Sequence, residues 1–166
     1  MRSISVRIAM IALATSQIAV PAGAEEEPKG AALAGAAFCE LVLNDAGKGL
    51  LYLFTRPFAQ LVDDALSRSD DIAEANPEEK PPFGDGIPFS SFPDRPTVCE
   101  VGAIVESATS GQVDIHYKFP ETPTADWTDR LVLAPDDGHL KIDDILYGAQ
   151  DYKIGLRAVA EEVLRQ

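Results

Sequence analysis

Residues 138–148 read GHLKIDDILYG and supply the last of four predicted β-strands, which together decide the fold. The four strands lie between Thr97 and Tyr147, and turn-forming residues separate them. Apolar and polar residues alternate along them with a period of two, most clearly in residues 112–119, and this pattern is typical of strands that bury one face. The sequence therefore predicts an antiparallel sheet that the rest of the chain covers.

The alternation assigns one face of each of the first three strands to the core. A hairpin turn is predicted at Pro135–Gly138, where glycine can adopt a positive φ, and the fourth strand is predicted to run from His139 to Tyr147. The residues expected to face the core are Cys99, Val101, Ala103 and Val105 in the first strand, Val113, Ile115, Tyr117 and Phe119 in the second, and Trp127, Asp129, Leu131 and Leu133 in the third.

Asp143 and Asp144 are the most suggestive pair of carboxylates in the chain. On a regular strand they point to opposite faces, so that Asp144 shares a face with Ile142 and Asp143 shares one with Ile145. One carboxylate is then partly buried, where loss of hydration raises its pKa and suits a general base. The alternative is a structural role, in which that carboxylate accepts backbone N–H groups of the long loop or caps a helix.

Three helices are predicted around the sheet, over residues 31–45, from Pro57 to about Asn76, and over residues 151–165. Proline is favoured at the first position of a helix, and the proline after Asn76 disfavours helical conformation there. The apolar stripes are Leu33, Ala37 and Leu41 with Phe38 and Val42 beside them in the first helix, Phe58, Leu61, Val62, Ala65 and Leu66 in the second, and Ile154, Leu156, Val159, Val163 and Leu164 in the third.

Residues 77–96 form a long loop that is rich in proline and contains two glycines. Proline-rich sequence is incompatible with a helix interior or a central strand. A loop of this length inside a compact domain is often functional. Its aromatic residues indicate that part of it packs on the body of the domain, and the apolar side chains concerned are Phe83, Ile87, Phe89 and Phe92.

The only two cysteines are Cys39, on the first predicted helix, and Cys99, on the first predicted strand. Cys99 lies on the apolar face of its strand, which should receive the helix that carries Cys39. In an oxidising compartment, an even pair of cysteines forms a disulfide more often than a metal site. We therefore expect a Cys39–Cys99 disulfide.

The first 24 residues have the pattern of a cleavable signal peptide. Arg2 and Arg7 precede a short apolar run, and small residues at Ala22 and Ala24 offer a cleavage site after Ala24 or, alternatively, after Ala22. The apolar run is too short for a membrane span, which needs about 20 residues. Export to a bacterial periplasm is the expected outcome, followed by one domain that covers residues 25–166.

The chain is strongly acidic, with a formal net charge of −13. Removal of residues 1–24 takes away Arg2 and Arg7 but no acidic residue, so that 12 basic and 27 acidic residues leave a charge of −15. Such a protein is a poor partner for nucleic acid or an anionic membrane surface. A basic protein or a cationic ligand is electrostatically compatible with this charge. The alternative explanation is that the charge only confers solubility.

Four segments, LVDDALSRSDDI (61–72), KPPFGDGIPFSSFPD (80–94), DWTDRLVL (126–133) and GHLKIDDILYG, together resemble domain-of-unknown-function family 3828. This is a set of exported bacterial proteins, and the resemblance spans roughly Leu50 to Tyr147. It implies an α+β fold like that of nuclear transport factor 2 (cystatin-like), in which a curved antiparallel sheet wraps around helices and forms a cone with a pocket. The family often has an aromatic residue where this chain has Leu140. The resemblance implies no established activity.

A small pocket at the mouth of such a cone is one hypothesis for the binding site, with a cationic or hydroxylated ligand. The alternative is that the same aromatic residues belong to the core and satisfy their polar tips at its rim. No metal or cofactor is expected, because His116 and His139 lack metal-ligand spacing to another His or Cys. The residues predicted to line the pocket are Tyr52, Tyr117, Trp127, Asp129, Asp144 and Tyr147.

Three functions are compatible with these features. The first is a non-enzymatic periplasmic protein that binds a small ligand or a partner protein through the cone, with the long loop at its rim. The second is an isomerase or dehydratase that uses Asp129 or Asp144 as general base, which fold analogy alone suggests. The third is an acidic inhibitor or immunity protein for a basic cell-wall enzyme. No Gly-x-Ser-x-Gly segment, P-loop or Cys/His nucleophile pattern supports a particular catalytic mechanism.

Overall fold

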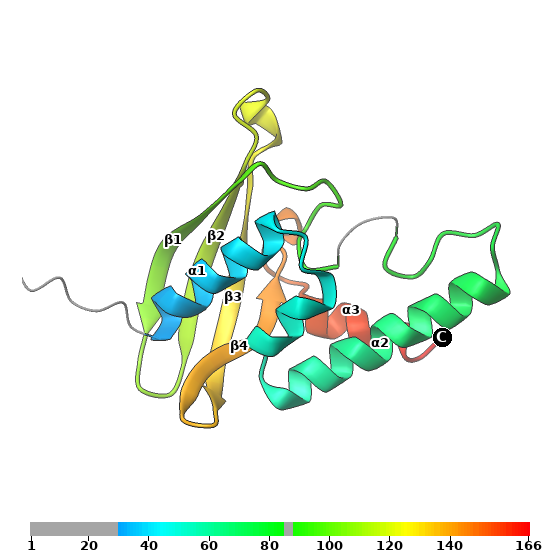
Figure 1. Cartoon of the computed structure of the whole chain (residues 1–166), viewed down its shortest axis with the longest axis horizontal. Helices are drawn as coiled ribbons and strands as arrows, with labels where there is room; N and C mark the ends of the chain where they lie inside the picture. The colour runs from blue at the N-terminus through cyan, green and yellow to red at the C-terminus, as the bar shows by residue number, and fades with distance from the viewer. Residues whose placement is uncertain (1–29, 85–87) are drawn as a thin grey trace, which may run out of the picture.

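The computed structural model describes residues 30–84 and 88–166 (Figure 1). The predicted signal peptide, residues 1–24, lies outside the described residues. The elements in chain order are α1 (Gly30–Leu43), the 3-10 helix η1 (Gly47–Leu53), α2 (Arg56–Ala75), β1 (Val98–Glu106), β2 (Gly111–Lys118), the 3-10 helix η2 (Pro123–Ala125), β3 (Trp127–Asp136), β4 (His139–Leu146), the 3-10 helix η3 (Gly148–Gln150) and α3 (Leu156–Val163).

Four antiparallel strands form one sheet in the order β1-β2-β3-β4, so the predicted α+β class is confirmed. In Figure 1, α1 lies across one face of this sheet, and α2 and α3 lie side by side next to β4. The apolar face of the sheet and the facing sides of the helices bury one continuous core. Its largest fully buried side chains include Tyr117, Phe38, Phe54, Phe58 and Ile115.

Helix α1 buries a different stripe from the one predicted. Phe38 and Val42 face the core as expected, but Leu33 is 55% exposed. The buried positions recur at helical spacing along a face that includes Gly35 and Cys39. The prediction for Leu33 was wrong because small residues, rather than the leucines, let α1 lie close against the sheet.

The Cys39–Cys99 disulfide is confirmed, with the two Cα atoms 5.3 Å apart. It joins α1 to β1, which is an edge strand of the sheet. Cys99 pairs with Tyr117 across β1 and β2, so the bond anchors the helix on the core side of the sheet.

The predicted face of β1 is wrong after Val101, because the strand contains a bulge. Val101 pairs with Ile115, but the next inner pair is Ile104 with Val113. One extra residue between these pairs reverses the alternation. Ala103 and Val105 therefore do not continue the face that carries Cys99, and Val105 is 70% exposed.

A second irregularity corrects the expectation for Asp143 and Asp144. Val132 pairs with Asp144, whereas Leu133 pairs with Ile142, so one residue of β4 is extra at this point. Ile142 and Ile145 both face the core and are fully buried. Asp144 does not share a face with Ile142, because the bulge interrupts the period of two.

Helix α2 follows its prediction, whereas the third helix differs in its length and in two of its predicted apolar positions, since Ile154 and Leu164 are each 43% exposed. Helix α2 begins with proline in its first turn and buries Phe58, Val62 and Ala65, as its apolar stripe indicated. The third helix is shorter than predicted, because η3 and two left-handed residues, Asp151 and Tyr152, precede it. Among the described residues, no helix is both long and apolar enough to cross a membrane.

The long loop packs on the core at Phe83, which is partly buried against it as predicted, and again in its second half. The Phe89 ring is buried and meets Phe54 edge to face, with ring centroids 5.9 Å apart. Phe92 meets Trp127 in the same way at 5.2 Å. The packing predicted for these two aromatic residues is confirmed, whereas Ile87 lies outside the described residues.

Candidate functional site

Asp129 is fully buried on β3, where it accepts hydrogen bonds from the long loop and from the chain after β4. The backbone N–H groups of Ser91 and Gly148 donate to its two oxygens at 2.8 and 2.9 Å. The Ser91 hydroxyl and the Trp127 indole N–H also donate to it. Burial raises the pKa of the Asp129 carboxyl, while these hydrogen bonds act in the opposite direction. The four donors thus join Asp129 to the loop at Ser91, to the chain after β4 at Gly148 and to its own strand at Trp127.

Three aromatic residues of the predicted pocket surround Asp129. Tyr117 stacks on Trp127 with ring centroids 4.8 Å apart. Tyr147 donates from its hydroxyl to the carbonyl oxygen of Pro88 at 2.7 Å. Burial raises the pKa of the Tyr117 and Tyr147 phenols, and the Asp129 charge adds to both effects. Within the described ranges, the Tyr117 hydroxyl has no hydrogen-bond partner.

Asp144 stabilises the start of α3. Its Oδ1 atom accepts hydrogen bonds from the backbone N–H groups of Ile145 and Arg157, at 2.8 and 3.0 Å. Any side chain on Gly155, the residue before α3, would place its Cβ 2.7 Å from these carboxylate oxygens. Burial raises the pKa of Asp144, and the two N–H groups counter this rise. Asp144 therefore has the helix-capping role that the sequence left open as the alternative to a general base.

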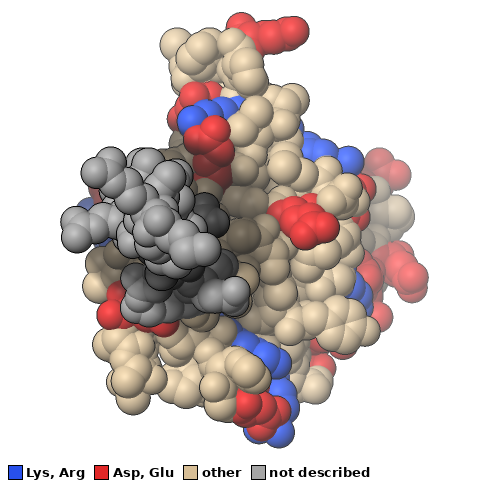
Figure 2. Space-filling view, turned by 60° about the vertical axis from the view of Figure 1, so that its left-hand side comes forward, with Lys and Arg blue, Asp and Glu red and all other residues tan. Residues whose placement is uncertain are grey.

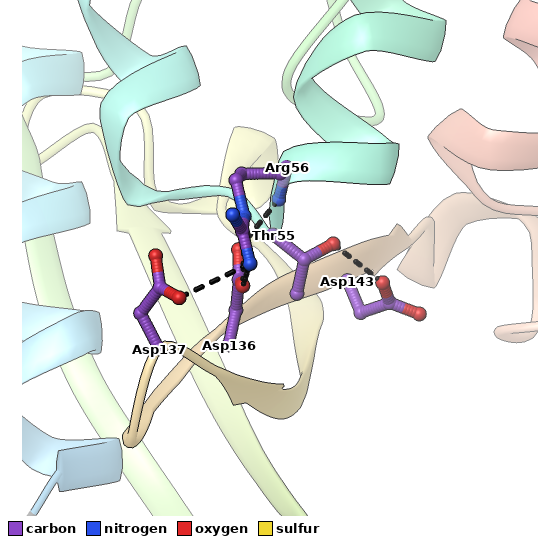
Figure 3. A network of polar contacts seen from close by, with 5 residues as sticks. All are labelled: Thr55, Arg56, Asp136, Asp137 and Asp143. Carbon is purple, nitrogen blue, oxygen red and sulfur yellow. Dashed lines mark hydrogen bonds and ion pairs between the residues drawn. The ribbon is translucent and has the colours of Figure 1, made fainter.

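A group of carboxylates in the β3–β4 hairpin binds the start of α2 (Figure 3). Asp136 accepts from the Arg56 backbone N–H at 2.7 Å and from its Nε at 3.2 Å, while Asp137 accepts from the guanidinium at 3.1 Å. Asp143 accepts from the Thr55 hydroxyl at 2.7 Å and pairs with Arg157 at 2.9 Å. The hairpin thus holds the N-termini of α2 and α3 together.

Asp136→Asn is expected to destabilise the protein at pH 7 but not in strong acid. The Arg56 N–H lowers the pKa of Asp136 below its ordinary value of 3.8. The ionised carboxylate therefore adds stability above pH 3.8, and this contribution is lost as the pH falls through the lowered pKa. Thermal unfolding at a series of pH values measures the effect. The melting temperatures of the native protein and of Asp136→Asn should differ at pH 7 and converge in acid.

Asp137→Asn is the matched control, because it removes the same charge from the neighbouring, largely exposed side chain but no backbone hydrogen bond. It should change the melting temperature little at any pH. If the melting temperatures of Asp136→Asn and the native protein differ as much at pH 2 as at pH 7, the ionised Asp136 carboxylate is not the origin of the effect.

A further surface depression lies elsewhere, and we call it the α1–η1 groove. Its volume is about 540 Å³, and it lies between α1, η1, the β1–β2 turn and the β3–β4 hairpin. Leu33 and Tyr52 line it and are 55% and 86% exposed. The residues that line it are Gly30, Leu33, Ala34, Ala37, Tyr52, Leu53, Glu106, Ser107, Ala108, Gly138, His139, Leu140 and Lys141.

The predicted site residues are thus divided among three places. Tyr117, Trp127, Asp129 and Tyr147 lie together inside the domain, Asp144 caps α3, and Tyr52 lies on the α1–η1 groove. A smaller cavity of about 350 Å³ beside the long loop includes only Tyr147 among them. In residues 30–84 and 88–166, no group of three or more His, Cys, Asp or Glu side chains is arranged to hold a metal ion.

Charged side chains are scattered over the face shown in Figure 2. On the described part of that face, Lys and Arg side chains do not gather into one continuous basic patch.

Comparisons of the sequence and structure with protein-family models, with curated proteins and with solved structures find no match. The class of the protein therefore rests on its architecture, which is α+β with helices packed against a four-stranded antiparallel sheet.

Proposed function

We propose that this chain is an exported, non-enzymatic binding protein and that the α1–η1 groove is its binding site. Its sequence resembles family 3828, and the helices packed on an antiparallel sheet are compatible with the cone of that family. The Cys39–Cys99 disulfide supports export to an oxidising compartment such as the periplasm.

The observation that carries this proposal is the apolar surface of the groove. Leu33 and Tyr52 are large, exposed apolar and aromatic side chains on its walls, and Leu53 and Leu140 extend the surface. A volume of about 540 Å³ lies in the range of small-molecule sites, which are mostly apolar with a few polar groups. Exposed apolar surface that is concentrated in a depression is typical of a binding site.

The hydrogen bonds of the two candidate bases, Asp129 and Asp144, favour a binding function over catalysis. Asp129 is surrounded by donors from the loop, and Asp144 is occupied by backbone N–H groups at the start of α3. A general base needs a free oxygen within reach of its substrate. Neither carboxylate lines the α1–η1 groove.

Leu33→Asp is expected to weaken the binding of a neutral apolar probe to the groove by about tenfold, because it places a charge on the apolar wall. Fluorescence titration with N-phenyl-1-naphthylamine measures this affinity without any contribution from probe charge. Unfolding free energy should change by no more than about 0.5 kcal/mol, since Leu33 is more than half exposed.

Leu164→Asp is the matched control, because Leu164 is 43% exposed at the end of α3 and does not line the groove. It should leave the affinity for the probe unchanged. If Leu33→Asp and Leu164→Asp bind the probe as tightly as the native protein does, the groove is not the binding site.

A further inference from the structure

We infer that the α1–η1 groove binds a single-chain amphiphile with a cationic head group, and that the carboxylate of Glu106 pairs with that head. The inference rests on the proposed function, since it names the class of ligand for the same groove. It follows from the position of one carboxylate at the end of an apolar face of α1.

The Glu106 carboxylate lies against the wall of the groove at the start of α1. Its Oε2 atom accepts a hydrogen bond from the backbone N–H of Ala31 at 3.1 Å. Its Oε1 atom is 3.9 Å from the position that a Cβ on Gly30 would take, and the Cβ of Leu140 is 3.6 Å from the same position. Gly30, Glu106 and Leu140 all line the groove. The carboxylate is therefore held beside the apolar Leu140 side chain.

One oxygen of this carboxylate is available to a ligand. Among the described residues, Glu106 forms no ion pair, and its hydrogen bond with Ala31 uses only Oε2. By contrast, Glu100 on the same strand pairs with Lys118. A carboxylate has about four acceptor positions, so Glu106 can bind an ammonium group while it keeps the N–H of Ala31.

The two basic residues that line the groove are not placed to neutralise Glu106. The pairing of β4 with β3 is regular from His139 to Ile142, so His139 and Lys141 alternate with Leu140 along β4. Consecutive residues of a strand point to opposite faces, so both basic side chains leave the face that carries Leu140. Glu106 thus remains a local negative charge at the apolar wall.

The apolar part of the groove extends from this carboxylate along one face of α1. Gly30, Leu33, Ala34 and Ala37 follow the i, i+3, i+4, i+7 spacing of a single helix face. The step from residue 30 to residue 37 spans roughly 10 Å of helix, which is long enough to contact an alkyl chain. Tyr52, which is 86% exposed, adds an aromatic ring from η1.

Charge and size favour a small cation over an anion or a folded protein. The chain carries a net charge of −13, which attracts cations at long range. A stable protein–protein interface uses about 20–30 residues on each side, and fewer residues than this line the groove. A single-chain amphiphile uses both features of the groove, because its chain covers the apolar face of α1 and its head reaches Glu106.

Isothermal titration calorimetry at pH 7 with three eight-carbon probes, octylammonium, octanol and octanoate, tests the inference. Octylammonium should bind the native protein about two- to fivefold more tightly than octanol does, which is the gain expected from one exposed ion pair. Octanoate should bind more weakly than either, because Glu106 repels its carboxylate. Added salt should reduce the preference for octylammonium, since the ion pair is exposed to solvent.

Glu106→Gln should abolish the preference for octylammonium and leave the affinity for octanol unchanged. The amide oxygen of the glutamine can still accept from the N–H of Ala31, so the start of α1 keeps its partner. Glu40→Gln is the matched control, because Glu40, on α1, is exposed, forms no ion pair with any described residue and does not line the groove. It changes the net charge by the same amount and should keep the preference.

Four other outcomes would overturn the inference. Equal binding of octylammonium and octanol, with octanol binding lost in Leu33→Asp, would exclude a cationic head but retain the groove as a binding site. A preference for octylammonium that survives in Glu106→Gln would assign it to the overall charge of the chain. Failure of every probe to bind would overturn both proposals. A dimer that Leu33→Asp disrupts, without octanol binding, would assign the groove to a second copy of the chain.

Discussion

Reducing the Cys39–Cys99 disulfide is expected to lower the free energy of unfolding by about 4 kcal/mol. The two cysteines are 60 positions apart, so the bond closes a long loop and restricts the unfolded chain. Small domains are stable by only about 5–15 kcal/mol in total, so this loss is a large fraction. Urea denaturation of the oxidised and the reduced protein, followed by the fluorescence of Trp127, measures the difference.

The Cys39→Ala, Cys99→Ala double variant separates the bond from any effect of the reductant. It should unfold at the same urea concentration as the reduced protein, apart from a small packing loss at the half-buried Cys99 and the buried Cys39. A difference below 1 kcal/mol between oxidised and reduced protein would show that the non-covalent contacts of α1, including those of Phe38 and Val42, hold it on the sheet without the disulfide. That result would also weaken the argument for export, because the fold would then be indifferent to the redox state of its compartment.

The elements with strict periodicity could be predicted from the sequence. In β2, Val113, Ile115 and Tyr117 face the core as their spacing indicated. In β3, Asp129 shares the inner face with Leu131 and Leu133, also as predicted. These strands lie in the middle of the sheet, where pairing on both sides enforces the period of two.

The two edge strands departed from their predictions because each contains an extra residue. In β1 the signal was Gly102, since glycine within a strand often marks a bulge. In β4 no comparable glycine is present, and consecutive Asp143 and Asp144 gave no indication that the alternation breaks. The consequence is chemical as well as geometric, because the bulge lets Asp143 and Asp144 serve the N-termini of α2 and α3.

The α1–η1 groove could not be predicted from the sequence, for a different reason. The helical spacing of Leu33 predicts a core position, although Leu33 is more than half exposed on the groove. The sequence places Tyr52 in one predicted pocket with Tyr117 and Trp127, but these two residues lie inside the domain. An apolar residue that serves binding has the same sequence pattern as one that serves packing, so only the three-dimensional arrangement distinguishes them.

Asp129→Ala is expected to cost about 3–5 kcal/mol of unfolding free energy, because it leaves several buried donors without an acceptor. The N–H groups of Ser91 and Gly148 and the Trp127 indole would all lose their partner. The loop segment around Ser91 should then detach from the core, and its amides should exchange hydrogen faster than those of β2. Urea denaturation and hydrogen exchange measure the two effects.

Asp129→Asn is the informative comparison, because it keeps one acceptor and removes the titration. Burial raises the Asp129 pKa above its value of 3.8 in the unfolded chain. Between these two values the folded protein binds a proton that the unfolded chain does not, so native stability declines as the pH rises through this window. The stability advantage of the native protein over Asp129→Asn should therefore be largest below pH 3.8 and smaller at pH 7. An advantage that grows with pH would show that the four donors outweigh burial, and that Asp129 stabilises the loop chiefly as an ionised carboxylate.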